Sequence, residues 1–109
     1  MGGTAPRAYG HRMATLHIEH PITDYSQWRA AFDRLAPVRR KAGVVAARVA
    51  RPVDDPHYIV VGLDFDTTEQ ATSFLHFLET QVWASPIAAP ALGGRPRTAI
   101  LSAEDAPVG

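Results

Sequence analysis

The chain has 109 residues, enough for one domain, and its hydrophobic fraction of 46% is ordinary for a globular protein. Eleven basic and eleven acidic side chains cancel, so neither nucleic acid nor a membrane is expected as a partner. The absence of cysteine excludes disulfides, thiolate nucleophiles and cysteine metal sites, and no apolar run approaches the ~20 residues that span a bilayer.

The chain divides into a leader, one domain and a tail. Residues 1–13 are rich in glycine, alanine and arginine without an apolar secretory segment, which favours a flexible leader and, by default, a cytoplasmic protein. Residues 14–104 carry the periodic patterns of a single domain, and residues 105–109 form a polar tail.

The first half of the domain predicts a strand followed by a helix. Residues 14–20 alternate apolar and polar side chains, which is typical of a half-buried strand. Thr23 and Asp24 are both competent N-caps for the apolar stripe that follows, and Gly43 is a natural residue just past the helix end. Pro37 lies inside this helix, so we expect a kink or a split there.

The second half predicts two strands, a helix and a last strand. Residues 44–52 and 57–65 form a predicted hairpin, and the apolar run in the second strand suggests burial on both faces. Asp66 is the expected cap of the next helix, with Glu69 at the capping-box position. Residues 97–103 then predict the fourth strand.

This order, βαββαβ, predicts an α+β, ferredoxin-like domain: a four-stranded antiparallel sheet with two helices on one face. The helices leave the other face of the sheet uncovered. A third strand that is apolar on both faces needs cover there, and a second copy related by two-fold symmetry is the simplest cover. We therefore expect a homodimer through the open sheet face.

Three segments resemble the dimeric α/β-barrel superfamily, specifically the small proteins of the antibiotic biosynthesis monooxygenase (ABM) family. They are HIEHPITDYSQWRAAFDRL, VARPVDDPHYIVVGLDFDTTEQATSFL and TQVWASP. The resemblance covers about residues 14–104 and rests on strand ends, helix entries and the placement of aromatic residues. It implies the dimeric α/β-barrel fold, whereas function follows from such a resemblance only by analogy.

The sequence departs from the family at two functional positions. Oxygenases of this family use an asparagine on the first strand, and the present chain contains no asparagine. Haem-degrading relatives carry an axial histidine after the second helix, and the stretch from Val82 to Ile87 has none. The resemblance therefore implies a protein without haem, and it leaves the cofactor-free oxygenase without one customary residue.

The stretch LHIEHP, residues 16–21, holds two histidines and a glutamate. Side chains alternate faces along a strand, so His17 and Glu19 share one face and His20 lies on the other. One histidine and one carboxylate fall short of the three protein ligands of a catalytic metal site. A third ligand could come from His57 or Asp64, but nothing in the spacing requires it, so we expect no metal. The family resemblance implies no other cofactor. His20, at the strand end, is expected at the surface or the rim.

His17 and Tyr58 are the candidate catalytic residues. His17 is expected on the face toward the partner subunit, near Arg48 or Tyr58 of the neighbouring strands. One interpretation is a hydrogen-bonded histidine within an interface. The other is proton transfer by His17 or Tyr58, for which the unperturbed pKa of histidine is suitable.

Five side chains are candidate ligand-binding residues, because they fall on the inner faces of the predicted helices or directly after the second helix. They are Trp28, Phe32, Arg39, Phe74 and Trp83. Aromatic walls with few polar groups are typical of ligand pockets, although aromatic stripes at helical spacing also simply fill cores. Arg39 is suited to a ligand carboxylate or phenolate; alternatively, it extends toward solvent at the helix end or pairs with an aspartate of the chain. Trp83 opens a proline-rich segment that could form a lid.

Two functions remain open from the sequence. The first is an ABM-like, cofactor-independent monooxygenase that acts on an aromatic or polyketide-like small molecule. The second is a non-catalytic dimeric module that binds a small ligand or serves a structural role. The family resemblance favours the first, and the missing asparagine favours the second. A cavity that contains an ionisable group with a perturbed pKa would favour the enzyme.

Overall fold

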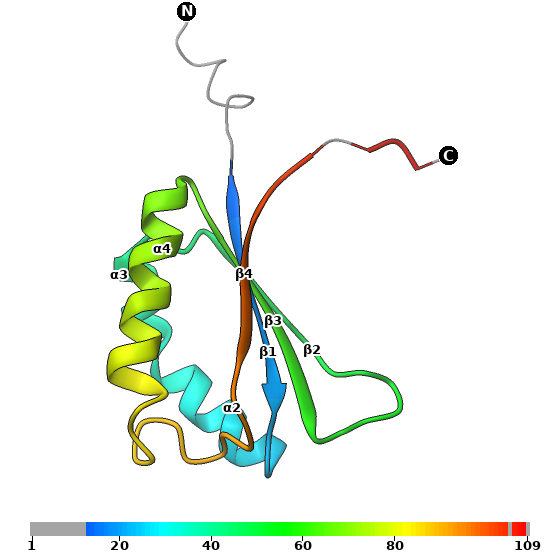
Figure 1. Ribbon diagram of the computed structural model, residues 1–109, viewed down its shortest axis with the longest axis vertical. Helices are drawn as coiled ribbons and strands as arrows, with labels where there is room; N and C mark the ends of the chain where they lie inside the picture. Colours follow the sequence, from blue (N-terminus) through cyan, green and yellow to red (C-terminus); the bar gives the residue numbers. More distant parts are fainter. Residues whose placement is uncertain (1–12, 105, 109) are drawn as a thin grey trace, which may run out of the picture.

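The computed structural model describes residues 13–104 and 106–108. A four-stranded antiparallel sheet has the spatial order β2-β3-β1-β4, and helices cover one of its faces (Figure 1). The strands are β1 (Ala14–Pro21), β2 (Ala46–Ala50), β3 (Tyr58–Phe65) and β4 (Arg97–Ser102). The predicted ferredoxin-like architecture is confirmed. The predicted leader lies outside the described residues except at Met13, as do positions 105 and 109 of the predicted tail.

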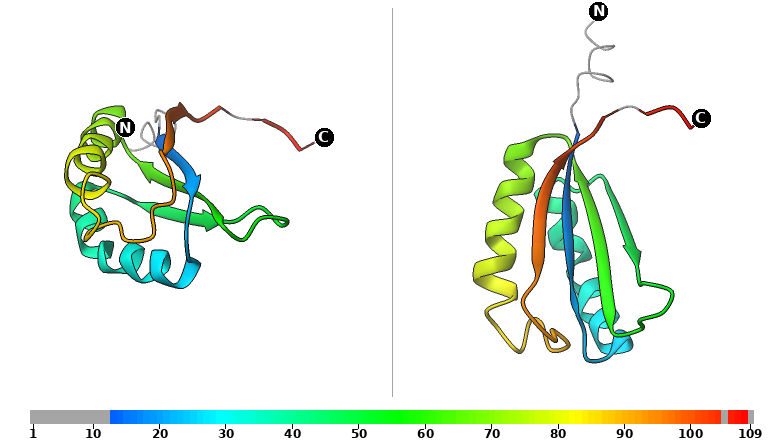
Figure 2. Two further views of the ribbon diagram at one scale, coloured as in Figure 1. Left: turned by 60° about the horizontal axis from the view of Figure 1, so that its bottom comes forward. Right: turned by 45° about the vertical axis from the view of Figure 1, so that its right-hand side comes forward.

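Two helical arms pack on the same face of the sheet (Figure 2). The first arm consists of α2 (Tyr25–Arg34) and α3 (Ala36–Ala42), and the second of α4 (Thr68–Phe77) and the π-helix η1 (Leu78–Val82). Together with β1, the two arms enclose the space in which the candidate ligand-binding residues lie.

The predicted split of the first helix is confirmed. Leu35 has φ −89° and ψ 4° and separates α2 from α3, while Pro37 falls in the first turn of α3. Proline is tolerated there, because the first N–H groups of a helix have no intrahelical acceptor. Gly43 ends α3 with φ 101°, the left-handed conformation that favours glycine, as predicted.

The predicted cap of the second arm is wrong by one residue. Thr67, rather than Asp66, is the N-cap of α4: its Oγ1 accepts a hydrogen bond from the Gln70 N–H at 3.1 Å. The Gln70 Oε1 in turn accepts from the Thr67 N–H at 3.2 Å, which completes the capping box one position later than expected.

At the C-terminal end of the second arm, the Trp83 N–H donates to the Leu78 carbonyl at 2.8 Å, five residues earlier, which is the spacing of a π-helix.

In the single chain β3 is buried on one face, and its predicted burial on both faces depends on the expected partner subunit. Alternate residues of β3 are fully buried beneath the helices: Ile59, Val61, Leu63 and Phe65. Their neighbours point to the open face and are only half-buried: Tyr58, Val60, Gly62 and Asp64. An apolar run does not by itself distinguish burial on one face from burial on two, because each valine or tyrosine suits either environment.

The core lies between the sheet and the two arms. Its main side chains are Leu16, Ile18, Ile59, Val61, Leu63, Phe65, Phe74 and Leu78. Full burial of a leucine, isoleucine or phenylalanine contributes roughly 1.5–3 kcal/mol, so these positions supply most of the driving force for folding. The ring centroids of Phe65 and Phe74 lie 5.9 Å apart, which joins α4 to the sheet.

Candidate functional site

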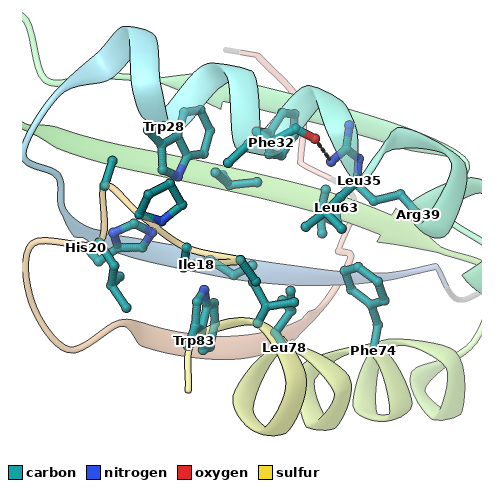
Figure 3. Close-up of a pocket in the computed structure, with 18 residues that line it drawn as sticks. Ile18, His20, Trp28, Phe32, Leu35, Arg39, Leu63, Phe74, Leu78 and Trp83 are labelled. Atoms are coloured by element: carbon teal, nitrogen blue, oxygen red, sulfur yellow. Dashed lines mark hydrogen bonds between the residues drawn. The ribbon is translucent and has the colours of Figure 1, made fainter. Parts of the chain in front are cut away.

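A pocket lies between the two helical arms, above the helix-facing side of the sheet (Figure 3). Its cavity has a volume of about 70 Å³, and its walls come from α2, α3, α4, η1, β1, β3 and the segment that follows η1. The structure brings all five candidate ligand-binding residues into this wall: Trp28, Phe32, Arg39, Phe74 and Trp83. Most of the lining is apolar, and the polar groups come from His20, Arg39 and the two indoles.

An ordered stack forms the wall contributed by the first arm. The rings of Trp28 and Phe32 are stacked, with centroids 4.9 Å apart and an interplanar angle of 21°. The guanidinium carbon of Arg39 lies 3.7 Å from the centroid of the Phe32 ring, within the range of a cation–π interaction. Helical spacing places Trp28 and Phe32 together, and Arg39, seven residues after Phe32, extends over the ring of Phe32.

The guanidinium of Arg39 is held by the backbone. Its Nη1 donates to the Phe32 carbonyl oxygen at 2.6 Å, a carbonyl near the end of α2. Burial lowers the pKa of Arg39, with a smaller opposing effect from the carboxylate of Asp33. Within the described residues, no carboxylate lies within ion-pair distance of Arg39. A half-buried cation therefore lines the pocket without an acidic partner there.

His20 is the polar group that sequence reasoning missed. It is only 3% exposed, and its imidazole lines the pocket, so the expected position at the surface or rim is wrong. Its ring lies edge-on to Trp83, with centroids 6.5 Å apart. The signal was present in the alternation of β1, because His20 lies on the same face as the buried Leu16 and Ile18.

The protonation of His20 follows from its surroundings. Burial lowers the pKa of His20, and its hydrogen bond to the Pro21 carbonyl opposes this only in part. The imidazole is therefore neutral at pH 7. Since a carbonyl oxygen only accepts, the His20 Nδ1 carries the proton and donates to Pro21 O at 2.8 Å. The Nε2 of His20 is left with a lone pair, which makes it a proton acceptor within the pocket.

The candidate catalytic residues, His17 and Tyr58, meet on the opposite side of the sheet. The Tyr58 hydroxyl donates to Glu19 Oε1 at 2.7 Å, and the His17 Nε2–H donates to Glu19 Oε2 at 2.8 Å. The hydrogen bond from His17, followed by that from Tyr58, lowers the pKa of Glu19. The hydrogen bond to Glu19 raises the pKa of Tyr58.

The sheet therefore divides the candidate residues into two groups. His17 and Tyr58 lie on the open face, whereas Trp28, Phe32 and Trp83 line the pocket beneath the helices. Within one chain, the first pair cannot reach a ring held by the second group, because the backbones of β1 and β3 lie between them.

A second polar cluster lies beside the first on the open face. Arg48 makes a bidentate contact with Asp64, at 2.8 and 2.9 Å, and the Thr15 hydroxyl donates to the same carboxylate at 2.6 Å. The hydrogen bond from Arg48 lowers the pKa of Asp64. The carboxylates of Glu19 and Asp64 are thus both satisfied by neighbouring side chains on this face.

Residues 13–104 and 106–108 contain no group of three or more histidine, aspartate or glutamate side chains arranged to hold a metal ion. No helix in the same part of the chain is long and apolar enough to cross a bilayer.

No family model and no curated protein matches the sequence. A structure from Caulobacter crescentus, described as a "putative antibiotic biosynthesis monooxygenase", is 16% identical and covers 94% of this chain and 100% of its own, with a TM-score of 0.65. One from Bordetella bronchiseptica with the same description is 11% identical, with coverages of 83% and 95% and a TM-score of 0.63. A "dimeric ferredoxin-like protein" from an uncultured marine organism is 12% identical, with coverages of 85% and 95% and a TM-score of 0.60.

These likenesses define the fold. The chain is a ferredoxin-like α+β protein, and its structure resembles those of proteins described as antibiotic biosynthesis monooxygenases. The family resemblance predicted from the sequence is thereby confirmed for the fold.

Proposed function

We propose that this protein is a cofactor-independent oxygenase that oxidises a small hydroxylated aromatic molecule in the pocket between the helices and the sheet. The single observation that carries the proposal is the neutral, buried imidazole of His20 beside Trp83 in an otherwise mostly apolar pocket. A buried base surrounded by aromatic walls is the arrangement that deprotonation of a bound aromatic requires.

His20 supplies the base in this reaction. A phenolic or enolic hydroxyl placed at Nε2 of His20 gives up its proton there, and the resulting anion is far more easily oxidised by molecular oxygen. For phenol itself the overall change is C₆H₅OH + O₂ → C₆H₄O₂ + H₂O, in which one oxygen atom enters the quinone product and the other leaves as water. This stoichiometry balances without an added reductant.

The size of the cavity limits the substrate. About 70 Å³ is less than the ~150 Å³ of an engineered apolar cavity that binds benzene. A single ring therefore enters only with a small outward movement of the wall, and a multi-ring polyketide needs a larger one. One wall of the cavity is the segment that begins at Trp83. Two backbone hydrogen bonds of 3.0 Å, from the Thr23 N–H to Ala91 O and from the Gly93 N–H to Pro21 O, hold this segment to the end of β1.

Oxygen uptake with a panel of single-ring and two-ring hydroxylated aromatics tests the proposal. We expect uptake with at least one compound, and we expect His20→Gln to lower the rate at least about 100-fold, because a general base contributes roughly 10²–10⁴-fold. His76→Gln is the matched control, since His76 is exposed on α4 away from the pocket. Loss of activity in His17→Gln but not in His20→Gln would move the site to the open sheet face.

A second function is favoured by a specific observation. The small cavity and the absence of asparagine suit a non-catalytic module that only binds a small apolar ligand. Saturable binding of aromatic compounds without any oxygen uptake would establish this alternative and contradict the oxygenase.

We further propose that the protein is a homodimer through its open sheet face. The helices cover the other face, while the open face carries exposed apolar side chains such as Leu101, which is 46% exposed. The carboxylates of Glu19 and Asp64 on this face already have partners, so the cost of burying them is reduced. A structure with the same fold is described as dimeric. Sedimentation at micromolar concentration tests this proposal, and a stable monomer would contradict it.

A further inference from the structure

We propose that the pocket selects an aromatic carboxylate, which Arg39 binds through its guanidinium. This inference rests on the proposed function in one respect, that the pocket between the helices and the sheet holds a small aromatic molecule. It adds the chemical class of that molecule: an acid whose carboxylate meets Arg39 and whose oxidisable end meets His20.

The first argument is that Arg39 lacks an acidic partner within the described residues. A half-buried charge without a counter-ion is costly, and burial already lowers the pKa of Arg39. By contrast, Arg29 forms an ion pair with Asp33 at 3.0 Å and Arg48 forms one with Asp64 at 2.8 Å, and the side chains of these two arginines are 47% and 58% exposed. Of these three arginines, the half-buried one without an acidic partner is the one that lines the pocket.

The second argument is that the guanidinium is already oriented. It lies over the Phe32 ring and donates one N–H to the Phe32 carbonyl, and this fixes its plane before a ligand arrives. A guanidinium has five N–H donors, so four remain for a ligand. Its planar fork matches the two oxygens of a carboxylate, and a fixed fork loses little entropy on binding.

The third argument is the placement of the two polar groups. In Figure 3, His20 lies near Trp83 at one end of the pocket, and Arg39 lies toward the other end, beyond Phe32. A neutral base and a cation at separate ends, with aromatic walls between them, match a ligand with a hydroxyl at one end, a ring in the middle and an anion at the other end.

The chain provides its own reporter for the test. It has two tryptophans, Trp28 and Trp83, and both line the pocket. Both indole N–H signals in a ¹H–¹⁵N spectrum therefore come from the pocket, and a shift of these signals reports a ligand bound there. Benzoate is the probe, and benzamide, which has nearly the same shape without the charge, is the matched comparison.

We expect benzoate to shift both indole signals and to bind at least about tenfold more tightly than benzamide, because charge-assisted hydrogen bonds are about twice as strong as neutral ones. Arg39→Gln should abolish this preference, whereas Arg40→Gln, the exposed neighbour, should retain it. Arg39→Lys keeps the positive charge and should retain part of the preference for benzoate. The ratio of the affinities for benzoate and benzamide in the unaltered protein tests the inference even if Arg39→Gln fails to fold.

The possible failures are distinguishable. Equal binding of benzoate and benzamide to the unaltered protein overturns the role of Arg39 but leaves the aromatic pocket intact. A preference for benzoate that survives in folded Arg39→Gln also overturns it. If neither compound moves the indole signals, the pocket itself is not a binding site, and the proposed function fails together with this inference.

Discussion

The pocket in this small domain should have a measurable cost in stability. Ala31 lies on α2, is 8% exposed and lines the cavity. A cavity lowers the free energy of unfolding by about 24 cal/mol per Å³, so a volume of about 70 Å³ corresponds to a loss of about 1.7 kcal/mol. Replacing Ala31 by leucine places three more carbons in this space. We expect Ala31→Leu to raise the free energy of unfolding by about 1 kcal/mol, since some of the gain is lost to imperfect packing.

Ala30→Leu is the matched control, because Ala30 is exposed on the same helix and the change in helix propensity is the same. Urea denaturation compares the two variants, and a gain of about 1 kcal/mol raises the Tm of a domain of this size by roughly 4–6 °C. Ala31→Leu should also abolish the binding of aromatic ligands, while Ala30→Leu should leave it unchanged. Destabilisation of Ala31→Leu by more than about 1 kcal/mol relative to Ala30→Leu would refute the reasoning, since it would mean that no space is available there.

Three further predictions test the base, the helix cap and the interface. The pKa of His20 is lower in the folded chain than the ordinary 6.5, so the stability due to its neutral form is complete above pH 6.5 and is lost as the pH falls below that value. The urea concentration at the unfolding midpoint should therefore decrease when the pH is lowered from about 7.5 to about 5.5, and it should decrease less in His20→Gln. Thr67→Ala should lower the free energy of unfolding by about 1 kcal/mol, as it removes the cap of α4, whereas Thr72→Ala on the exposed side of the helix should not. Leu101→Asp should convert the proposed dimer into a monomer in sedimentation, and Val53→Asp, in the exposed hairpin loop, should leave it intact.

The features that follow from local periodicity were predictable from the sequence. The alternation of β1 placed His17 and Glu19 on one face, and the structure confirms it. The split near Pro37 and the left-handed Gly43 follow from the geometry of single residues, so the sequence was sufficient for both.

The features that depend on packing were not predictable. Asp66 and Thr67 are both good caps, and only the path of the chain out of β3 decides that Thr67 has the extended backbone and Gln70 the reciprocal position. His20 was assigned to the rim because Pro21 ends the strand, but the segment after η1 folds back over it: the Gly93 N–H bonds to Pro21 O at 3.0 Å. The alternation of β1 places His20 on the buried face, but the contact between two segments some 70 residues apart, which covers His20 at the strand end, leaves no local signal.

The separation of the two candidate groups follows from strand parity, which places His17 on the face of the sheet opposite the helices. The structure shows that the sheet lies between His17 and Trp28, and that His20 is the histidine on the pocket side.

The most direct test of the central claim, that the pocket beneath the helices binds a small aromatic molecule, is a titration of the ¹⁵N-labelled protein with phenol, read at the indole signals of Trp28 and Trp83. The account predicts saturable shifts of both signals in the unaltered protein and in Ala30→Leu, and none in Ala31→Leu. Unmoved indole signals, or equal shifts in Ala31→Leu, would contradict it.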